Sequence, residues 1–211
     1  MNSRFPVEVN GRWSEVEFQF GTAKQASLLT RWRPPPRVRG QAVVRDALEY
    51  ARLASKRWRY YEKANASAGS LDDLREKIQR QPGAEIAMIF TAVATWRSPT
   101  PIVGFAFVRR SWCNHLIVDF LSVHPRVIAR TPEQIRGVGA GILHQLVALA
   151  EQLETLCIWG EATAHSAPFY QRILGVEKIL DHFFIEDEVM AHCREEWHRK
   201  HQQMLARRRP Q

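Results

Sequence analysis

Three apolar segments of strand length follow one another in the middle of the chain, and they limit the fold more than any other feature. They span residues 85–94, 102–109 and 115–124. The connections between them are short, which favours antiparallel pairing of neighbouring strands. A fourth apolar segment, residues 155–162, follows only after an amphipathic helix. A right-handed parallel strand–helix–strand unit is therefore expected from residue 115 to residue 162.

The segments around this centre complete a mixed α/β pattern. Asn10-Gly11, a strong signal for a hairpin turn, lies within residues 7–20. Pro34-Pro35-Pro36 excludes a helix interior and predicts an extended connector. The other expected elements are helices over residues 42–61, 70–80, 166–174 and 188–206 and one or two strands within 176–186. The sequence predicts a mixed, mostly antiparallel sheet flanked by helices, with one parallel unit and an N-terminal β-hairpin extension.

The length of 211 residues fits one domain with additions at its ends. We expect a β-hairpin and Pro/Arg-rich connector over residues 1–39. An α/β domain is expected over residues 40–190, followed by a basic C-terminal helix or tail over residues 191–211.

The formal net charge of +8 is concentrated in two short segments. Residues 31–40 carry four arginines and no acid, and residues 194–211 carry six cations against two acids, so the remainder of the chain is neutral. Such segments bind nucleic acid in some proteins. Neither segment is interleaved with a stacking array of aromatic residues, so we favour a solvated loop and a solvated tail.

Targeting and cysteine usage point to the cytoplasm. No apolar run is long enough to span a membrane, and the N-terminus lacks the apolar stretch of a signal peptide. The cysteines, Cys113, Cys157 and Cys193, are odd in number and widely spaced, which indicates a reducing compartment. We expect no membrane partner.

A glycine-rich segment precedes the amphipathic helix of the parallel unit. It reads Arg136-Gly137-Val138-Gly139-Ala140-Gly141. Backbone N–H groups at a helix start, together with the helix dipole, form an anion site when glycines let a ligand approach. The segment lacks the Gly-Lys-Ser/Thr of a Walker loop, and Ile142 stands where a dinucleotide-binding fingerprint needs its third glycine. A plain helix-capping glycine turn remains an alternative.

The flanks of this segment resemble the GNAT (N-acetyltransferase) superfamily. Arg136-x-x-Gly139-x-Gly141 resembles its acyl-CoA-binding motif, and Val123-His124-Pro125 resembles the strand end that precedes that motif. Downstream, Phe169-Tyr170 and Leu174-Gly175-Val176 resemble the family's tyrosine-bearing helix and its end. The resemblance covers about residues 40–186 and is least regular between Pro125 and Arg136, where Arg130, Thr131 and Pro132 lie in a longer loop.

The resemblance implies transfer of an acetyl group from acetyl-CoA to a primary amine. It makes residues 40–190 the acyl-CoA-binding domain. The residues expected to hold acetyl-CoA are Leu121, Ser122, Val123, Arg136, Gly137, Val138, Gly139, Ala140, Gly141, Ser166 and Tyr170. Within this set, a backbone N–H of Val123 or a neighbour would stabilise the thioester oxygen. Ser166 has an alternative as a helix cap.

Tyr170 is the expected general acid and Asp119 the first candidate for the general base. Asp119 is an acid inside an apolar strand, four residues before Val123 and so expected on the same face. Glu161, at the end of the next strand, is the second candidate, and His124 and His165 are weaker ones. A structural carboxylate at position 119 and a core aromatic at position 170 remain alternatives.

No metal is expected. The C-terminal residues His192, Cys193, His198 and His201 match no standard zinc spacing. The acceptor stays open among small molecules, peptides, proteins and charged tRNA, the last as a toxin-like acetyltransferase. A non-catalytic GNAT-fold module that binds nucleic acid or protein through its basic clusters is the alternative from another class. The sequence leaves room for a homodimer.

Overall fold

The computed structural model describes residues 2–98, 101–129 and 134–208. Its strands are β1 (Asn2–Val9), β2 (Arg12–Phe20), β3 (Ile86–Val93), β4 (Ile102–Arg110), β5 (Leu116–Val123), β6 (Ile135–Arg136), β7 (Ile158–Glu161) and β8 (His182–Ile185). Its α-helices are α1 (Ala23–Leu29), α2 (Ala42–Lys63), α3 (Leu71–Arg80), α4 (Pro125–Ile128), α5 (Val138–Gln152), α6 (Ala167–Leu174) and α7 (Asp187–Arg208), with a 3-10 turn η1 (Pro36–Val38).

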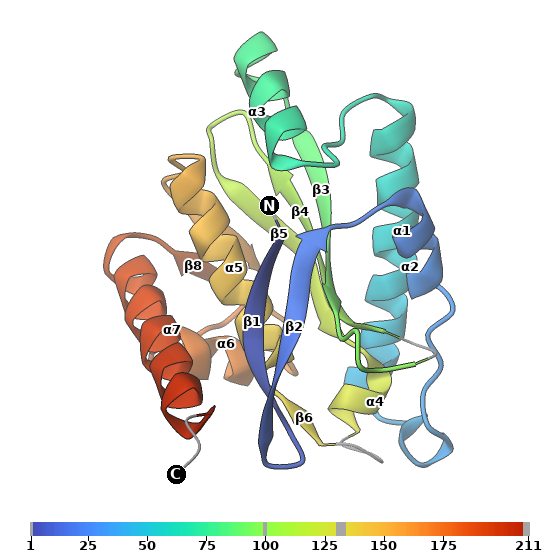
Figure 1. Cartoon of the computed structure of the whole chain (residues 1–211). Coiled ribbons are helices and arrows are strands. Elements are labelled where there is room, and N and C mark those ends of the chain that lie inside the picture. The colour runs from blue at the N-terminus through green and yellow to red at the C-terminus, as the bar shows by residue number, and fades with distance from the viewer. Residues whose placement is uncertain (1, 99–100, 130–133, 209–211) are drawn as a thin grey trace.

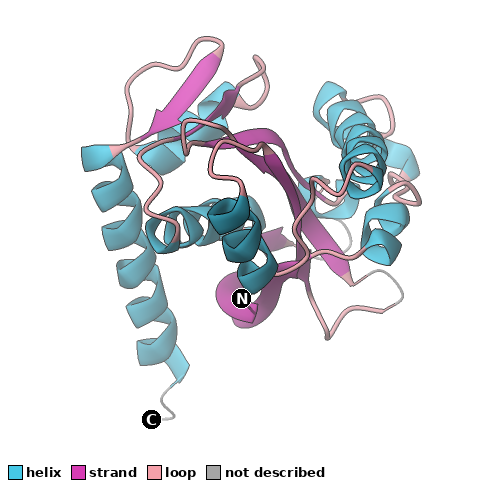
Figure 2. Cartoon of the chain, turned by 90° about the horizontal axis from the view of Figure 1, so that it is seen from above, coloured by secondary structure: helices cyan, strands magenta, loops and turns pink. Residues whose placement is uncertain are grey.

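All these strands form one sheet in the order β6-β1-β2-β3-β4-β5-β7-β8. β3, β4 and β5 pair antiparallel, and β5 pairs with β7 in parallel across the α5 crossover. The predicted mixed α/β fold with one parallel strand–helix–strand unit is therefore confirmed. Figure 1 shows α5, α6 and α7 on one side of the sheet and α1 and α2 on the other, and Figure 2 shows the same two groups from above.

The alternation of side chains along each strand fills two cores, one on each face of the sheet. On β3, Ile86, Met88 and Phe90 belong to the core beneath α5, whereas Ala87 and Ile89 belong to the core beneath α2. Because both faces are covered, β3 and β4 are apolar at nearly every position, which is what made these segments conspicuous in the sequence.

The predicted N-terminal hairpin is part of this sheet. Its strands are longer than expected, beginning at Asn2, and β2 pairs antiparallel with β3. The short strand β6, just before the glycine-rich segment, adds to the outer edge of β1. The hairpin thus reaches from the centre of the sheet to the start of α5.

Several elements differ from the expectation. α1, absent from the prediction, begins at a capping box in which Thr22 and Gln25 satisfy each other's backbone N–H groups. The turn η1 and the short elements α4 and β6 were also not predicted, since two to four residues leave no periodic signal. Residues 176–186 contain one strand, β8.

The C-terminal segment is a docked helix and not a solvated tail. α7 buries Cys193 and Met204 and packs against α5, α6 and β1. Its described cations Arg194 and Arg199 stay exposed, so the basic face is solvated as expected; residues 209–211 lie outside the described residues. Within the described ranges, no helix combines the length and apolar character needed to cross a bilayer.

Candidate active site

A bulge in β5 shapes the centre of the candidate site. Phe120 pairs with Phe107 of β4, but the next pair joins Val118 to Val108, so Asp119 is one residue more than the partner strand has. An extra residue bends a strand and reverses which face the following side chains occupy. The bulge therefore divides β5 into two halves with different neighbours.

Beyond the bulge, β5 separates from β7. The parallel pairing joins only Leu116, Ile117 and Val118 to β7. At the far end, the N–H of His124 donates to the Val103 carbonyl of β4 at 2.8 Å. Donors alternate between the two edges of a strand, so the N–H of Val123 points to the edge where β7 has already diverged. An unpaired backbone donor therefore faces a gap in the sheet.

The start of α5 supplies further donors. Gly137 caps the helix with φ of +94°, a left-handed conformation that glycine adopts without strain. The first intrahelical bond of the segment runs from the Gly141 N–H to the Gly137 carbonyl at 2.8 Å. The N–H groups of Val138, Gly139 and Ala140 precede it and so have no intrahelical acceptor. Together with the helix dipole, they form a site of positive potential.

The other two glycines of this segment have packing roles. A Cβ on Gly141 would lie 2.2 Å from the Phe5 ring of β1, so only glycine fits beneath that ring. A Cβ on Gly139 would lie 3.3 Å from Phe169 of α6 and 3.8 Å from Val123. Gly141 is thus a packing position whose N–H is already bonded to the Gly137 carbonyl. Gly139 lies between the start of α6 and the unpaired half of β5.

Arg136 lies at the rim of this segment, held by the hairpin. It is exposed, and its guanidinium lies 3.9 Å from Glu8 of β1. Gln134 exchanges hydrogen bonds with Asn10 at the hairpin turn, at 2.9 and 3.0 Å. The irregular loop before it includes Arg130, Thr131 and Pro132, which lie outside the described residues.

Tyr170 is buried in the core beneath α5, on that side of the gap. It is 4% exposed and stacks on Phe183 of β8, with ring centroids 4.0 Å apart. Burial raises its pKa well above the ordinary value, and the nearby Tyr50 hydroxyl adds to this shift. The hydroxyl therefore remains protonated at neutral pH and well above it.

Asp119 lies on the opposite face from Val123, so the expectation that they share a face is wrong. Its carboxylate accepts hydrogen bonds from Arg109 at 2.6 and 2.8 Å and pairs with Arg57 of α2 at 2.8 Å. Val123 instead packs in the core beneath α5. The bulge is the reason, because the extra residue cancels the alternation that would have aligned positions 119 and 123.

Glu161 ends β7 at the gap and is exposed. Its charge acts on Tyr50 of α2, whose ring is tilted against Phe120 with ring centroids 5.4 Å apart. The pKa of Tyr50 is raised, first by burial and then by Asp46. Tyr50 also adds to the raised pKa of Tyr170, so the two phenol groups interact electrostatically near the point where β5 and β7 separate.

The remaining candidates have structural partners. His124 is 2% exposed, and its Nδ1 accepts from the Arg126 N–H at 3.1 Å. Burial lowers the pKa of His124 to about 4. Ser166 does not cap α6; its hydroxyl accepts from the Thr163 N–H at 2.9 Å. His165 is exposed beside them.

Two regions are candidates for ligand binding, the C-terminal histidines for a metal and the start of α5 for an anion. Among the described residues, no group of three or more His, Cys, Asp or Glu side chains could hold a metal ion. The C-terminal histidines lie along α7, and His192 packs against Gly175. The only ligand chemistry at the start of α5 is that of an anion facing backbone N–H groups.

Sequence reasoning missed four residues of this site. Tyr50 and Arg57 were expected only as parts of a helix, and Thr163 and Phe169 as neighbours of more prominent residues. The polar side chains of α2 that face the sheet carry no local signal of their own. Only the packing of α2 over β5 brings them to the gap.

Comparisons with known proteins are limited to overall shape. Neither a scan against models of protein families nor a search of curated proteins returned a match. A protein of Desulfovibrio desulfuricans assigned to the GNAT family gives a TM-score of 0.49 at 15% identity, over 81% of this chain and 98% of that one. The PaiA N-acetyltransferase of Thermoplasma acidophilum, solved with coenzyme A, gives 0.45 at 14% identity, over 82% and 99%.

Other similar structures are matched over a smaller part. A protein of Bacillus anthracis assigned as a streptothricin acetyltransferase, solved with acetyl-coenzyme A, gives 0.36 at 17% identity, over 48% of this chain and 63% of that one. For nourseothricin acetyltransferase the chain spans 48% of the length, at 22% identity and a TM-score of 0.33. These values describe what the chain resembles, and its chemistry follows from its own residues.

Proposed function

We propose that this protein transfers an acetyl group from acetyl-CoA to a primary amine. The observation that carries the proposal is the gap between β5 and β7, which opens at Asp119 and faces the free N–H groups at the start of α5. A thioester on a long anionic carrier needs both parts: donors for its phosphates and a slot between strands for its arm. The GNAT-like sequence motifs lie at these two positions.

The start of α5 binds the pyrophosphate in this proposal. The N–H groups of Val138, Gly139 and Ala140, which precede the first intrahelical bond, donate to phosphate oxygens, and Arg136 adds charge at the rim. The backbone of Leu121, Ser122 and Val123 lines the slot for the arm. The Val123 N–H donates to the thioester oxygen as charge builds on it.

Tyr170 is the proposed general acid. In the reaction, the acceptor nitrogen attacks the acetyl carbon, a C–N bond forms, and the C–S bond breaks. The departing thiolate takes its proton from the Tyr170 hydroxyl, which solvent reprotonates. Because burial raises the pKa of Tyr170, the hydroxyl is protonated when the thiolate departs and readily regains a proton afterwards.

Glu161 is the proposed general base, in preference to Asp119. The Asp119 carboxylate is held by two guanidinium groups and is only 10% exposed, so its lone pairs are engaged. Glu161 is exposed beside Tyr50 and Thr163 at the same gap as Tyr170. It takes the proton from the acceptor amine directly or through a water molecule.

Calorimetric titration with acetyl-CoA tests the first step, and release of free CoA thiol with simple amines tests turnover. We expect binding to depend on the start of α5, so Gly139→Val, which fills the space beside Phe169, should weaken it. No binding of acetyl-CoA to the folded wild-type protein would refute the proposal. Binding without turnover for any amine would leave a non-catalytic CoA-binding module.

Two substitutions test the assigned roles. Tyr170→Phe keeps the ring on Phe183 and removes the hydroxyl, so kcat should fall by about 10- to 100-fold with acetyl-CoA affinity unchanged. Glu161→Gln should lower kcat/KM by a similar factor, and raising the pH should recover part of the loss because more amine is already neutral. Unaltered kinetics in both variants would remove these assignments.

A further inference from the structure

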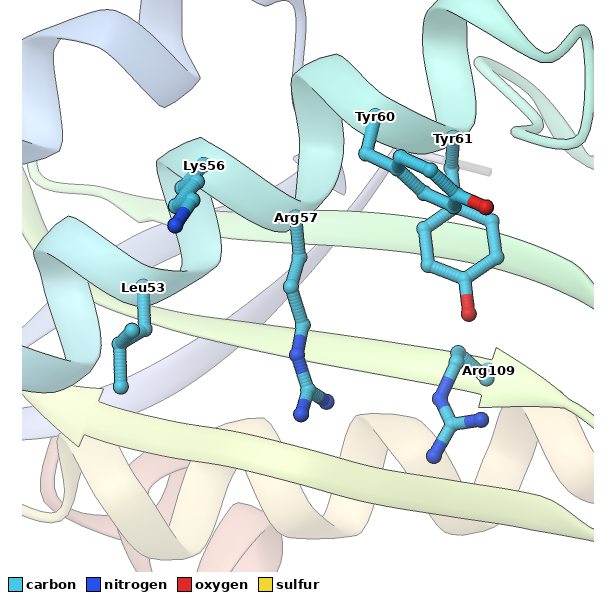
Figure 3. A pocket seen from close by; sticks show the side chains of 6 residues that line it. All are labelled: Leu53, Lys56, Arg57, Tyr60, Tyr61 and Arg109. Atoms are coloured by element: carbon cyan, nitrogen blue, oxygen red, sulfur yellow. The ribbon is translucent and has the colours of Figure 1, made fainter.

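A basic hollow lies against α2, one to two helical turns beyond the candidate active site. Its volume is about 440 Å³, and its lining residues are Leu53, Lys56, Arg57, Tyr60, Tyr61 and Arg109. Figure 3 shows the side chains of α2 above β4 and β5, with Arg57 and Arg109 both extending toward β5. Three cations and two phenol rings in one hollow have the chemistry of a receptor for an anionic group.

The cations of this hollow are not all neutralised. Arg109 is fully engaged by Asp119 and by Glu85, and its pKa is raised chiefly by the hydrogen bonds to Asp119. Arg57 gives one nitrogen to Asp119 but keeps a 47% exposed side chain. Lys56 forms no ion pair with any residue that the structure describes. Three cations thus face two carboxylates, Asp119 and Glu85, and the excess positive charge of the hollow lies at Lys56 and on the exposed side of Arg57.

Ring contacts through Phe120 connect the hollow to the candidate active site. Arg57 lies over the Phe120 ring at 5.0 Å, and Tyr50 lies against the same ring at 5.4 Å. Tyr50 in turn contacts Thr163 and feels the charge of Glu161. The seven-residue step from Tyr50 to Arg57 along α2 corresponds to about 10 Å. An extended molecule could reach from the gap to the hollow along Phe120.

We propose that this hollow is an acceptor subsite, and that the acceptor carries an anionic group about 10 Å from its reactive amine. It rests on the proposed acetyl transfer and names its class of substrate. The amine lies beside Glu161, and the anion, a phosphate or a carboxylate, lies between Lys56 and the exposed side of Arg57. The 70% exposed Tyr60 offers its hydroxyl and its ring at the outer rim.

The test uses four amidated tetrapeptides, Ala-Ala-Ala-X, with a free N-terminal amine. X is phosphoserine, glutamate, glutamine or lysine. In an extended peptide, position X lies about 10 Å from the N-terminal amine. We expect KM to be about ten-fold lower for the phosphoserine or glutamate peptide than for the glutamine peptide, and highest for lysine. The phosphoserine and glutamate arms tell a phosphate site from a carboxylate site.

Lys56→Glu should reverse this order, while the KM of the glutamine peptide stays the same. Lys24→Glu, on the exposed face of α1, makes the same change in net charge outside the hollow and should leave the order intact. The preference should also shrink between 50 and 500 mM salt, values chosen to span Debye lengths of about 14 to 4 Å. Equal KM values for all four peptides would overturn the subsite and leave acetyl transfer standing.

Calorimetry of the peptides without acetyl-CoA separates the two proposals. If no peptide is acetylated but the anionic peptides bind and Lys56→Glu abolishes that binding, the hollow is an anion site, and the proposed activity falls together with the acceptor role of the hollow. If neither anionic peptide binds more tightly than the glutamine peptide and KM shows no preference, the hollow does not recognise acceptors.

Discussion

The two halves of β5 are both mainly apolar but have different neighbours. Leu116 to Val118 pair with β4 on one edge and β7 on the other, whereas Phe120 to Val123 pair with β4 alone. The first half is ordinary sheet interior. The second half presents backbone donors and acceptors to a gap. A strand can thus provide both a core and a binding slot, provided one inserted residue separates the two functions.

Asp119 is that inserted residue, and its partners explain why the bulge is stable. Its side chain turns toward α2, where Arg57 and Arg109 hold it. Sequence alone made it the leading catalytic base, but its contacts favour a role in fixing the point of divergence. Substitutions at several positions test whether the two halves of β5 differ in this way.

Disrupting the paired half of β5 should cause the largest loss of stability. A Cβ at Gly160 would lie 2.6 Å from the Val118 carbonyl and 2.9 Å from Phe183, so Gly160→Val forces β7 away from β5. We expect a loss of about 3 kcal/mol or more in the free energy of unfolding, measured by urea denaturation. Gly83→Val, where no atom lies within 4 Å, is the control and should change stability by less than about 0.5 kcal/mol.

A substitution at Asp119, the bulge residue between the two halves, should cause the next largest loss of stability. Asp119→Asn removes the charge that pairs with Arg57 and Arg109, and we expect a loss of about 3 kcal/mol. Urea denaturation with a parallel measurement of kcat checks this. A variant with wild-type stability and no activity would return Asp119 to the role of general base.

The stability of the protein should depend on pH through His124, which follows the open half of β5. His124 has its pKa lowered from 6.5 to about 4 by burial, so the folded state binds its proton less readily than the unfolded state. Its contribution is therefore complete above about pH 6.5 and is lost as the pH falls toward 4, by about 3 kcal/mol. His124→Asn, which keeps a capping side chain, should flatten this part of the stability curve.

The buried His144 of α5, whose pKa is also lowered to about 4, should contribute a similar slope and remain in that variant. Urea denaturation from pH 4 to pH 7 measures both. An unchanged slope in His124→Asn would show that His124 is solvated or protonated in the folded protein.

The smallest effect concerns amide exchange and leaves stability unchanged. The Leu116 N–H donates to the Cys157 carbonyl at 3.0 Å, whereas the Val123 N–H faces the gap. We expect the Val123 amide to exchange at least ten-fold faster than that of Leu116 in the free protein. Added acetyl-CoA should slow Val123 selectively. Equal protection of both amides without ligand would mean that the gap is closed.

Much of the architecture could be predicted from residues near in sequence. The apolar segments of β3, β4 and β5 and the stripe of α5 are local patterns, and the short connections fix their antiparallel order. The helix expected over residues 70–80 is present as α3, with the Ser70 hydroxyl accepting from the Asp73 N–H at its start. The roles of Arg136 and Tyr170 remain predictions from motifs, and the role of Glu161 remains a prediction from its place at the end of a strand.

Tertiary structure decided the rest. That Gly141 accommodates Phe5, that Asp119 is an extra residue facing α2, and that Tyr50 acts electrostatically on Tyr170 all depend on residues distant in the chain. The sequence by itself determined which segments form strands and helices, because hydrophobic periodicity is local. Only the folded chain decided which face each polar residue occupies beyond the bulge, because a single unpaired residue reverses the alternation and leaves no mark in the pattern.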